Sequence, residues 1–308
     1  MHILLAGGTG FIGSPLRRRL VRDGHTLLAL TRHPAGRPDE PGVRWLAWDG
    51  GWERAMADVD AVVNFTGEPL VGRRWTPSQK QRLQDSRVAT TQRLVRAMAE
   101  ASRRPAVLVN ASAIGYYGPR GDEVLTESDV GGRGTLADLC RAWEAEAQQA
   151  EAAGVRVVRL RLGVVLGPGG ALAKMAPPFR LWLGGPLGSG VQWVSWIHLD
   201  DALGLILWAL ARRDIAGALN ATAPQPVTMR EFCRTLGRVL HRPSWLPAPA
   251  PALRLLLGEA ADVLLTGQRV IPHVAMNQGY TFVFPELTGA LRACFGRSSA
   301  LTPSVSAS

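Results

Sequence analysis

The sequence predicts an α/β protein built on a parallel sheet, and two features indicate it. The chain opens with an apolar run at residues 3–6, a glycine-rich turn at residues 7–13, and a helical stretch that starts at Pro15. Short apolar strands then alternate with amphipathic helices for half of the chain. Strands joined by helical crossovers form an open parallel sheet that is covered on both faces. The predicted fold is therefore a doubly wound, Rossmann-like sheet with a smaller C-terminal substrate lobe.

The glycine-rich turn has the pattern of a dinucleotide-binding loop. Gly7 lets the chain turn sharply, Gly10 lets the backbone approach a pyrophosphate, and Gly13 lets the helix pack close to the strand. The helix N-terminus adds unpaired N–H groups and a partial positive charge. An ordinary glycine-rich turn is the alternative, but strand, turn and helix follow in the order that dinucleotide binding requires.

The second strand, residues 26–30, ends where the ribose of a dinucleotide is usually recognised. Thr31, Arg32 and His33 stand there, so no carboxylate could accept hydrogen bonds from a free 2′-hydroxyl. Arg32 can pair bidentately with a 2′-phosphate, which a carboxylate would repel. The sequence therefore favours NADP(H) over NAD(H), and a solvated surface arginine is the competing interpretation.

The other elements follow from apolar runs and helical periodicity. Strands are expected at residues 61–65, 106–111 and 155–160, and long helices at 79–101 and 137–153. Ligands in such sheets bind beyond the carboxyl ends of the strands. The segments 65–67, 112–113 and 162–164 are therefore expected to face one crevice. Glu127 and Asp129 are expected on a solvated loop.

The predicted domains are a nucleotide-binding domain over residues 1–165 and a smaller lobe over residues 166–296. Glycine, proline and tryptophan become frequent after residue 165, and the strand–helix rhythm changes there. Further sheet elements are expected from residues 190–222. Residues 297–308, rich in Ser, Ala and Pro, are expected to form a flexible tail.

Composition limits the partners and the location. The formal charge is +10, but the arginines are spread along the chain without a nucleic-acid-binding motif, so no nucleic-acid partner is expected. The three cysteines are far apart, which fits free thiols in a reducing compartment, and no metal-ligand spacing occurs. The apolar run 202–211 is too short to span a bilayer, and the N-terminus leaves no room for a signal peptide. A cytoplasmic protein without a membrane partner is expected.

Several motifs together resemble the extended short-chain dehydrogenase/reductase superfamily. They are SAIGYYG at 112–118, RLGVVLGP at 161–168 and WIHLDD at 196–201. Others resemble its atypical, epimerase-like branch, the sugar-nucleotide-epimerase-like proteins. They are RWT at 74–76, DSR at 85–87, WE at 143–144, FRL at 179–181, GGP at 184–186 and GQRVIP at 267–272. The last motif belongs to a C-terminal domain of unknown function, here residues 248–296. The resemblance covers the chain to about Gly296.

The resemblance implies NADP(H) binding and a small-molecule substrate that it does not identify. The residues that it places along the cofactor are Gly7, Thr9, Gly10, Phe11, Ile12, Gly13, Thr31, Arg32, Phe65, Thr66, Gly67, Gly163 and Val164. Arg87 stands where an Asn near the cofactor is usual, and Arg82 is a weaker candidate. His198 and Asp200 resemble a motif that mostly anchors the smaller lobe.

The catalytic pair of that superfamily is absent from this chain. Its reductases use a Tyr as the acid/base and a Lys four residues later, whose ammonium lowers the phenol pKa. None of the three tyrosines here is followed by such a Lys, and Leu139 and Trp143 occupy the expected helical positions. Two interpretations stay open. One is an NADP(H)-dependent oxidoreductase or epimerase in which Tyr117 or Tyr116, with Ser112, donates the proton at the crevice mouth. The other is a non-catalytic NADP(H)-binding regulatory or scaffold protein.

Superfamily members often pair through their two long helices, which favours a homodimer through residues 79–101 and 137–153. The second of these helices carries several charged residues, so a monomer stays open as the alternative.

Overall fold

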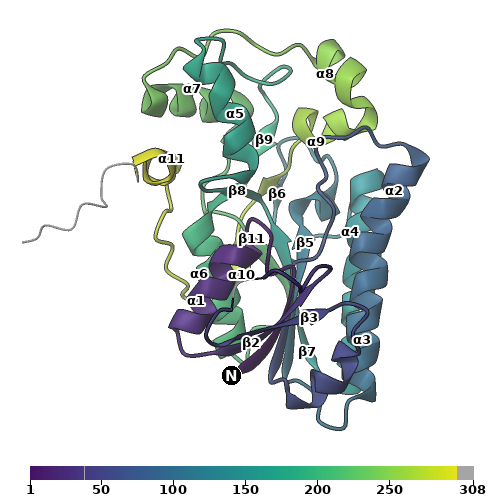
Figure 1. Cartoon of the computed structure of the whole chain (residues 1–308). Helices are drawn as coiled ribbons and strands as arrows, with labels where there is room; N and C mark the ends of the chain where they lie inside the picture. The colour runs from purple at the N-terminus through teal and green to yellow at the C-terminus, as the bar shows by residue number, and fades with distance from the viewer. Residues whose placement is uncertain (38, 297–308) are drawn as a thin grey trace, which may run out of the picture.

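The computed structural model describes residues 1–37 and 39–296, and it has the predicted α/β architecture (Figure 1). The expected tail, residues 297–308, lies outside the described residues. Seven strands, all parallel to their neighbours, form the central sheet. In spatial order they are β3 (Val43–Ala47), β2 (Thr26–Thr31), β1 (His2–Ala6), β4 (Ala61–Asn64), β5 (Val107–Ala113), β7 (Arg156–Leu162) and β11 (Gly217–Ala221). The strand order reverses between β1 and β4, which is where ligands bind in doubly wound sheets.

Helices cover both faces of this sheet, as the continuous apolar runs of its strands require. Ile3 and Leu5 pack on the side of α1 (Gly13–Arg22) and α6 (Leu199–Ala211). Leu4 and Ala6 pack on the side of α3 (Thr90–Glu100), beside α4 (Thr135–Gln148). The edge strand β3 was not predicted; none of its side chains is fully buried, and Arg44 interrupts its apolar residues.

The two long predicted helices are each composed of more than one helical element. The first comprises α2 (Pro77–Gln84), a π-helical turn η2 (Asp85–Ala89) and α3, and the side chain of Thr76 caps its N-terminus by accepting from the backbone N–H of Gln79. The second comprises α4 and the short η4 (Gln149–Ala153), and it ends at Gly154 in a left-handed conformation. π-Helical turns are frequent at functional sites, and η2 carries Arg87.

The smaller lobe has its own apolar core, centred on Phe179, Trp196, Phe232, Leu236 and Leu291. Its helices are α5 (Gly170–Arg180), α7 (Met229–Leu240), α8 (Ala250–Leu257), α9 (Asp262–Leu265) and α11 (Leu287–Gly296). Short elements complete the lobe and its junction with the sheet domain: β6 (Val124–Leu125), β8 (Val164–Leu166), β9 (Trp193–Val194), β10 (Trp196–His198), β12 (Val227–Thr228), β13 (Arg269–Val270), η3 (Ile114–Tyr117) and η5 (Gly258–Ala261). The turn η1 (Trp52–Asp58) belongs to the sheet domain, where it packs against α3.

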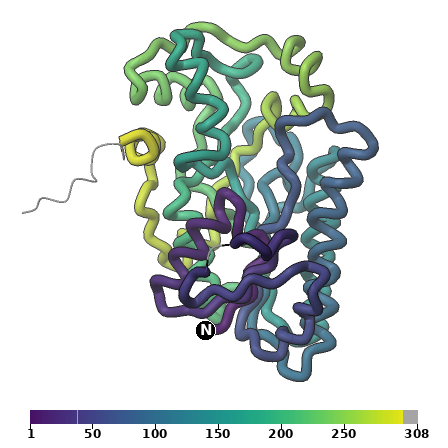
Figure 2. Tube along the Cα trace, viewed as in Figure 1, coloured from purple at the N-terminus to yellow at the C-terminus, as the bar shows by residue number. Residues whose placement is uncertain are grey.

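The C-terminal segment crosses back onto the sheet domain before it reaches α11. Figure 2 shows the yellow-green chain descending from the lobe beside the sheet and then returning to α11. Along this path β13 pairs with β6, and α10 (His273–Asn277) packs against β11. Residues 248–296 therefore contact both the lobe and the sheet domain.

The α6 N-terminus holds this returning segment. His198 is buried, its Nδ1 accepts a hydrogen bond from the Asp200 backbone N–H at 3.1 Å, and its ring stacks on Phe284 at 4.0 Å. These contacts fit the structural role expected for His198. The neighbouring Asp201 also holds the segment. Its carboxylate accepts hydrogen bonds from the backbone N–H groups of Val283 (2.7 Å) and Phe284 (2.9 Å).

Candidate functional site

A crevice of about 350 Å³ opens beyond the carboxyl ends of β1, β4, β5 and β7. The strand-end segments 65–67, 112–113 and 162–164 all contribute to its walls, so the structure brings them together. Of the candidate residues, those that line the crevice are Phe11, Ile12, Phe65, Thr66, Gly67, Arg87, Ser112, Gly163 and Val164. The others, which do not line the cavity itself, are Gly7, Thr9, Gly10, Gly13, Thr31, Arg32, Arg82, Tyr116 and Tyr117.

The glycines of the first turn differ in how much space a side chain would have. Gly7 has φ +85°, and a Cβ there would lie 2.6 Å from the carbonyl carbon of Phe65. A Cβ on Gly13 would lie 2.0 Å from the Gly7 carbonyl oxygen. A Cβ on Gly10 would lie 3.4 Å from the same carbonyl oxygen, which is an ordinary contact distance. The fold itself therefore needs glycine at 7 and 13, whereas the protein leaves room beside Gly10.

The end of β2 presents a cation. Arg32 is exposed, and Thr31 is buried with its hydroxyl oxygen accepting from the backbone N–H of His33 at 3.3 Å. In the described part of the chain, Arg32 forms no ion pair with a carboxylate. The guanidinium is thus open to an anionic ligand beyond the strand end.

Arg87 brings a second cation to the crevice, and this one is buried. Its side chain donates to the carbonyl oxygens of Glu68 (2.9 Å) and Leu83 (3.2 Å) and lies 5.3 Å from the ring centre of Trp143. The residue is 7% exposed, and burial lowers the pKa of the guanidinium. No ion pair to a carboxylate offsets this burial within residues 1–37 and 39–296. Arg82, the weaker candidate, is exposed on α2.

Trp143 stands where the superfamily pattern would place a Lys, and it is turned into the protein. Its Nε1–H donates to the Thr91 hydroxyl at 3.0 Å. Thr91 belongs to a buried group with Asn64 and Asn110, in which Asn64 Nδ2 donates to Thr91 Oγ1 at 3.0 Å and to Asn110 Oδ1 at 2.7 Å. Asn64 Oδ1 in turn accepts from the Thr66 hydroxyl at 2.6 Å. This network fixes Thr66 at the crevice. Its members come from residues 64–143, so no local sequence pattern indicates it.

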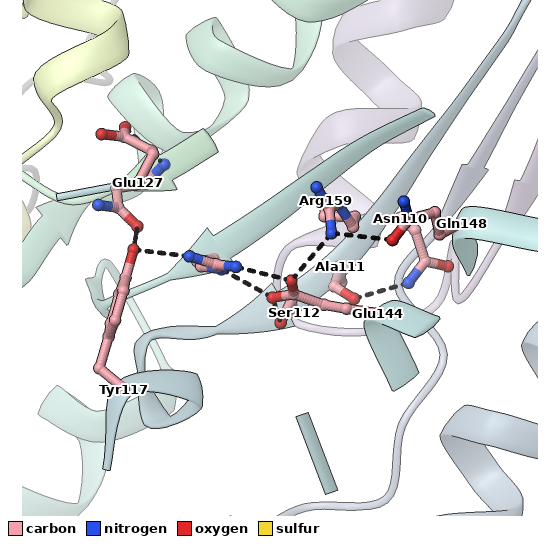
Figure 3. A network of polar contacts seen from close by, with 10 residues as sticks. Asn110, Ala111, Ser112, Tyr117, Glu127, Glu144, Gln148 and Arg159 are labelled. Carbon is pink, nitrogen blue, oxygen red and sulfur yellow. Dashed lines mark hydrogen bonds and ion pairs between the residues drawn. The ribbon is translucent and has the colours of Figure 1, made fainter. Parts of the chain in front are cut away.

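A second buried network lies behind the crevice wall (Figure 3). Glu144 on α4 accepts two hydrogen bonds from Arg161 on β7, at 2.8 and 2.9 Å. It also accepts one from the Ser112 hydroxyl at 2.7 Å. Arg161 donates to the Tyr117 phenol oxygen at 2.9 Å, and the Tyr117 hydroxyl donates to Asn220 Oδ1 at 2.7 Å. The serine and the tyrosine that were candidate proton donors are thus joined through one buried ion pair.

The expected position of Tyr117 at the crevice mouth is wrong. Its side chain is 0% exposed, and burial raises the pKa of the phenol to about 12 against the opposing effect of the Arg161 guanidinium. Tyr116 lies with its ring centre 3.5 Å from that guanidinium. The η3 turn directs both rings toward Arg161 of β7. The sequence does not indicate these contacts.

Glu127 was expected on a solvated loop, and this expectation is also wrong. Its carboxylate accepts from the backbone N–H groups of Asn220 (3.0 Å) and Val274 (3.2 Å). Burial raises the pKa of this carboxyl, and the two hydrogen bonds oppose that shift. The burial comes from α10, about half the chain away, so no local pattern could have indicated it.

Comparison with known proteins decides the family. Residues 3–221 match the model described as the NAD dependent epimerase/dehydratase family. This chain belongs to that family. Residues 248–294 match a domain of unknown function, DUF1731, that was expected at this end of the chain.

Full-length relatives of this epimerase-family chain include proteins of plants and bacteria. An Arabidopsis thaliana protein named epimerase family protein SDR39U1 homolog, chloroplastic, is 44% identical over 302 residues, covering 95% of this chain and 86% of that protein. The epimerase family protein YfhF of Bacillus subtilis is 38% identical over 294 residues, covering 94% and 97%.

A solved structure of human epimerase family protein SDR39U1 (isoform 2) with NADPH superposes with a TM-score of 0.86 at 36% identity, covering 96% of this chain and 99% of that one. MoeE5 in complex with UDP-glucuronic acid and NAD has a TM-score of 0.78 at 23% identity and covers 96% and 97%. The likeness to MoeE5 concerns the fold alone.

None of the helices in residues 1–37 and 39–296 combines the length and apolarity needed to cross a membrane. The same residues contain no cluster of three or more His, Cys, Asp or Glu side chains suited to a metal ion.

Proposed function

We propose that this epimerase-family protein binds NADP(H) along the crevice. The observation that carries the proposal is the exposed Arg32 at the end of β2, where no carboxylate stands. The turn at residues 7–13 fits the group, because Gly10 leaves open space for a phosphate while Gly7 and Gly13 keep the backbone close. The human relative solved with NADPH, at 36% identity, supports the same cofactor.

The chain's own residues would hold the cofactor at three places. Arg32 and Thr31 would contact the adenosine phosphate, and residues 9–13 with the α1 N-terminus would face the pyrophosphate. Phe65, Thr66 and Gly67 would pass along the dinucleotide, with Gly163 and Val164 near the nicotinamide. Once bound, this group supplies a hydride donor or acceptor.

We propose that any chemistry here is an epimerase-like oxidoreduction of a small molecule without a tyrosine proton donor. Ser112 lines the crevice and is next in sequence to Ala113, where the superfamily pattern usually has a Ser or Thr. Because it donates its hydrogen to Glu144, it offers only lone pairs to a ligand. It would therefore accept a hydrogen bond from a substrate hydroxyl. Leu136, Leu139 and Trp143 line the same cavity and suit a flat or apolar group.

A non-catalytic NADP(H)-binding regulatory or scaffold protein is the second candidate, and the position of Tyr117 favours it. A phenol that is buried, hydrogen-bonded and shifted to a pKa of about 12 is unsuited to proton transfer near neutral pH.

A crystal soaked with NADPH tests the proposal. Density for the dinucleotide over residues 7–13 with its 2′-phosphate at Arg32 would support it. Density elsewhere, or no binding at all, would refute it. A second ligand in the crevice beside Ser112 would favour the oxidoreductase, whereas a crevice filled by cofactor alone and no turnover would favour the regulatory protein.

Two further proposals concern assembly and location. The helical surface formed by α3 and α4, which pack side by side on one face of the sheet (Figure 1), would pair in a homodimer. Light scattering that gives the monomer mass at high concentration would decide against it. Cys140 and Cys233 are buried and form no disulfide, which fits a cytoplasmic location. Fractionation of cells that express the protein would test this.

A further inference from the structure

The far end of the smaller lobe exposes a group of large apolar side chains. Leu181, Trp182 and Leu183 follow α5, and Trp245 and Leu246 lie between α7 and α8; we call these five residues the apolar rim. The two tryptophans are 56% and 62% exposed. Figure 1 shows the ends of these helices at the pole of the molecule opposite the N-terminus, and α8, with exposed Leu255 and Leu256, lies at the same end. Exposed apolar clusters of this kind mark interaction surfaces.

The two halves of the rim are fixed to each other. Trp245 Nε1 donates to the carbonyl oxygen of Trp182 at 2.9 Å, and the backbone N–H of Trp245 donates to Gly184 at 2.9 Å. Trp182 has φ +65°, a left-handed conformation that costs free energy for a bulky residue. An exposed tryptophan therefore stands at a position whose backbone conformation is unfavourable for it.

The charge around the rim has one sign. Residues 152–199 and 232–258, which contain both halves of the rim, include no Asp or Glu. Arg180 is exposed immediately before Leu181, and the Arg242 guanidinium lies 4.7 Å from the ring centre of Trp182. Arg254 on α8 is 3.8 Å from Asp262. In the described part of the chain, Arg180 and Arg242 form no ion pair with a carboxylate. Apolar side chains beside these two arginines match a surface that is apolar inside and anionic outside.

We propose that the apolar rim binds the surface of an anionic lipid bilayer. Tryptophan favours the headgroup region, leucine the acyl boundary, and arginine the anionic headgroups. A second copy of the chain would bring Arg180 and Arg242 of one rim toward those of the other, and their charges would repel. A nucleic acid would use the arginines and tryptophans but offers no apolar environment for the leucines. The proposal departs from the expectation of no membrane partner, which rested on the lack of a run long enough to span a bilayer; a surface contact needs no such run. It is also independent of the proposed cofactor.

Sedimentation of the full chain with vesicles tests the proposal. Vesicles of equal parts phosphatidylglycerol and phosphatidylcholine should bind the protein about tenfold or more tightly than pure phosphatidylcholine, and high salt should weaken the binding. The double variant W182S/W245S and the single variant L183E should each lose the binding. The exposed positions make these variants tolerable to the fold, which thermal unfolding would verify. Val130→Ser, which removes an exposed apolar side chain outside the rim, should bind vesicles like the parent chain.

A second readout uses intrinsic fluorescence. Anionic vesicles should shift the emission of the parent chain to shorter wavelength and leave that of W182S/W245S unchanged. The proposal is overturned if the parent chain ignores anionic vesicles at low salt, or if the rim variants bind them as tightly as the parent does. It is also overturned if the chain forms dimers without vesicles and L183E abolishes them, since the rim would then be a contact between copies.

Discussion

Arg161 donates a hydrogen bond to the phenol oxygen of Tyr117 at 2.9 Å, while its other two nitrogens hold Glu144. This contact joins a residue of the motif at 112–118 to the neighbouring strand β7 and, through Asn220, to β11 and the C-terminal segment. A tyrosine in the region where related enzymes keep a proton donor is here part of the buried framework.

Tyr117→Phe should destabilise the protein by about 1–3 kcal/mol, because it removes the Tyr117 partner of Arg161 Nη1 and of Asn220 Oδ1 in a buried place. The effect should depend on pH. The folded-state pKa of about 12 lies above the unfolded value near 10, so the native state keeps the proton more strongly. Stability from this group is fully present below pH 10 and is lost as the pH rises toward 12.

Urea unfolding of both proteins between pH 8 and 12 would measure this. The free energy of unfolding of the parent should fall by roughly 2–3 kcal/mol more than that of Tyr117→Phe between pH 8 and 12. Tyr280, whose pKa burial also raises, remains in both proteins. Parallel pH profiles for the two proteins would contradict the buried position of Tyr117.

Glu144→Ala should cost about 3–5 kcal/mol, because Arg161 would keep a buried, uncompensated charge. Glu144→Gln should cost nearly as much, since the amide retains the shape but not the charge. Glu123→Ala removes an exposed partner of Arg120 and should change stability by less than about 1 kcal/mol. Urea midpoints that fall equally for Glu144→Ala and Glu123→Ala would show that the buried network contributes little.

Arg32→Ala should weaken NADPH binding about tenfold to a hundredfold, since one charge-assisted bidentate contact contributes roughly 1.5–3 kcal/mol. NADH, which lacks the 2′-phosphate, should bind weakly to both proteins. Arg22→Ala is the matched control, because Arg22 is an exposed arginine at the C-terminus of α1, away from the nucleotide-binding turn. Fluorescence titration would check these affinities. Equal affinities of the parent chain for the two cofactors would mean that Arg32 is a solvated surface residue.

Gly10→Val should impair cofactor binding, whereas Gly13→Ala should impair stability. A side chain at position 10 meets little of the protein, so Gly10→Val should keep its unfolding temperature and lose cofactor binding. A Cβ at position 13 would lie 2.0 Å from the Gly7 carbonyl oxygen, so Gly13→Ala should lose about 1–3 kcal/mol or more of stability. Calorimetry and NADPH titration of both variants separate the two effects. Unchanged affinity in a folded Gly10→Val variant would place the nucleotide elsewhere.

NADPH should remain unoxidised, or nearly so, with simple ketones and common sugar nucleotides. A general acid typically contributes about 10²–10⁴-fold, and no tyrosine lines the crevice. Any turnover that a substrate screen finds should fall in Ser112→Ala and stay unchanged in Tyr116→Phe. Fast oxidation that Tyr117→Phe abolishes without loss of stability would restore the tyrosine as the proton donor.

The sequence alone determined the sheet, the nucleotide-binding turn and the meeting of the strand ends. These features are local or periodic: glycine spacing fixes the turn at residues 7–13, and apolar runs mark buried strands. The end of β2 could also be assessed locally, because Arg32 directly follows its strand. The edge strand β3 escaped prediction because none of its side chains is fully buried and Arg44 interrupts its apolar residues.

Only the tertiary structure decided what lies around the polar groups. Tyr117 meets Arg161 and Asn220, and Glu127 meets Val274, across large separations in sequence. Burial and long-range hydrogen bonds depend on how strands and the returning C-terminal segment pack, and no local spacing encodes them. The same is true of the apolar rim, in which Trp182 and Trp245 lie 63 residues apart and are joined by a hydrogen bond from Trp245 to Trp182.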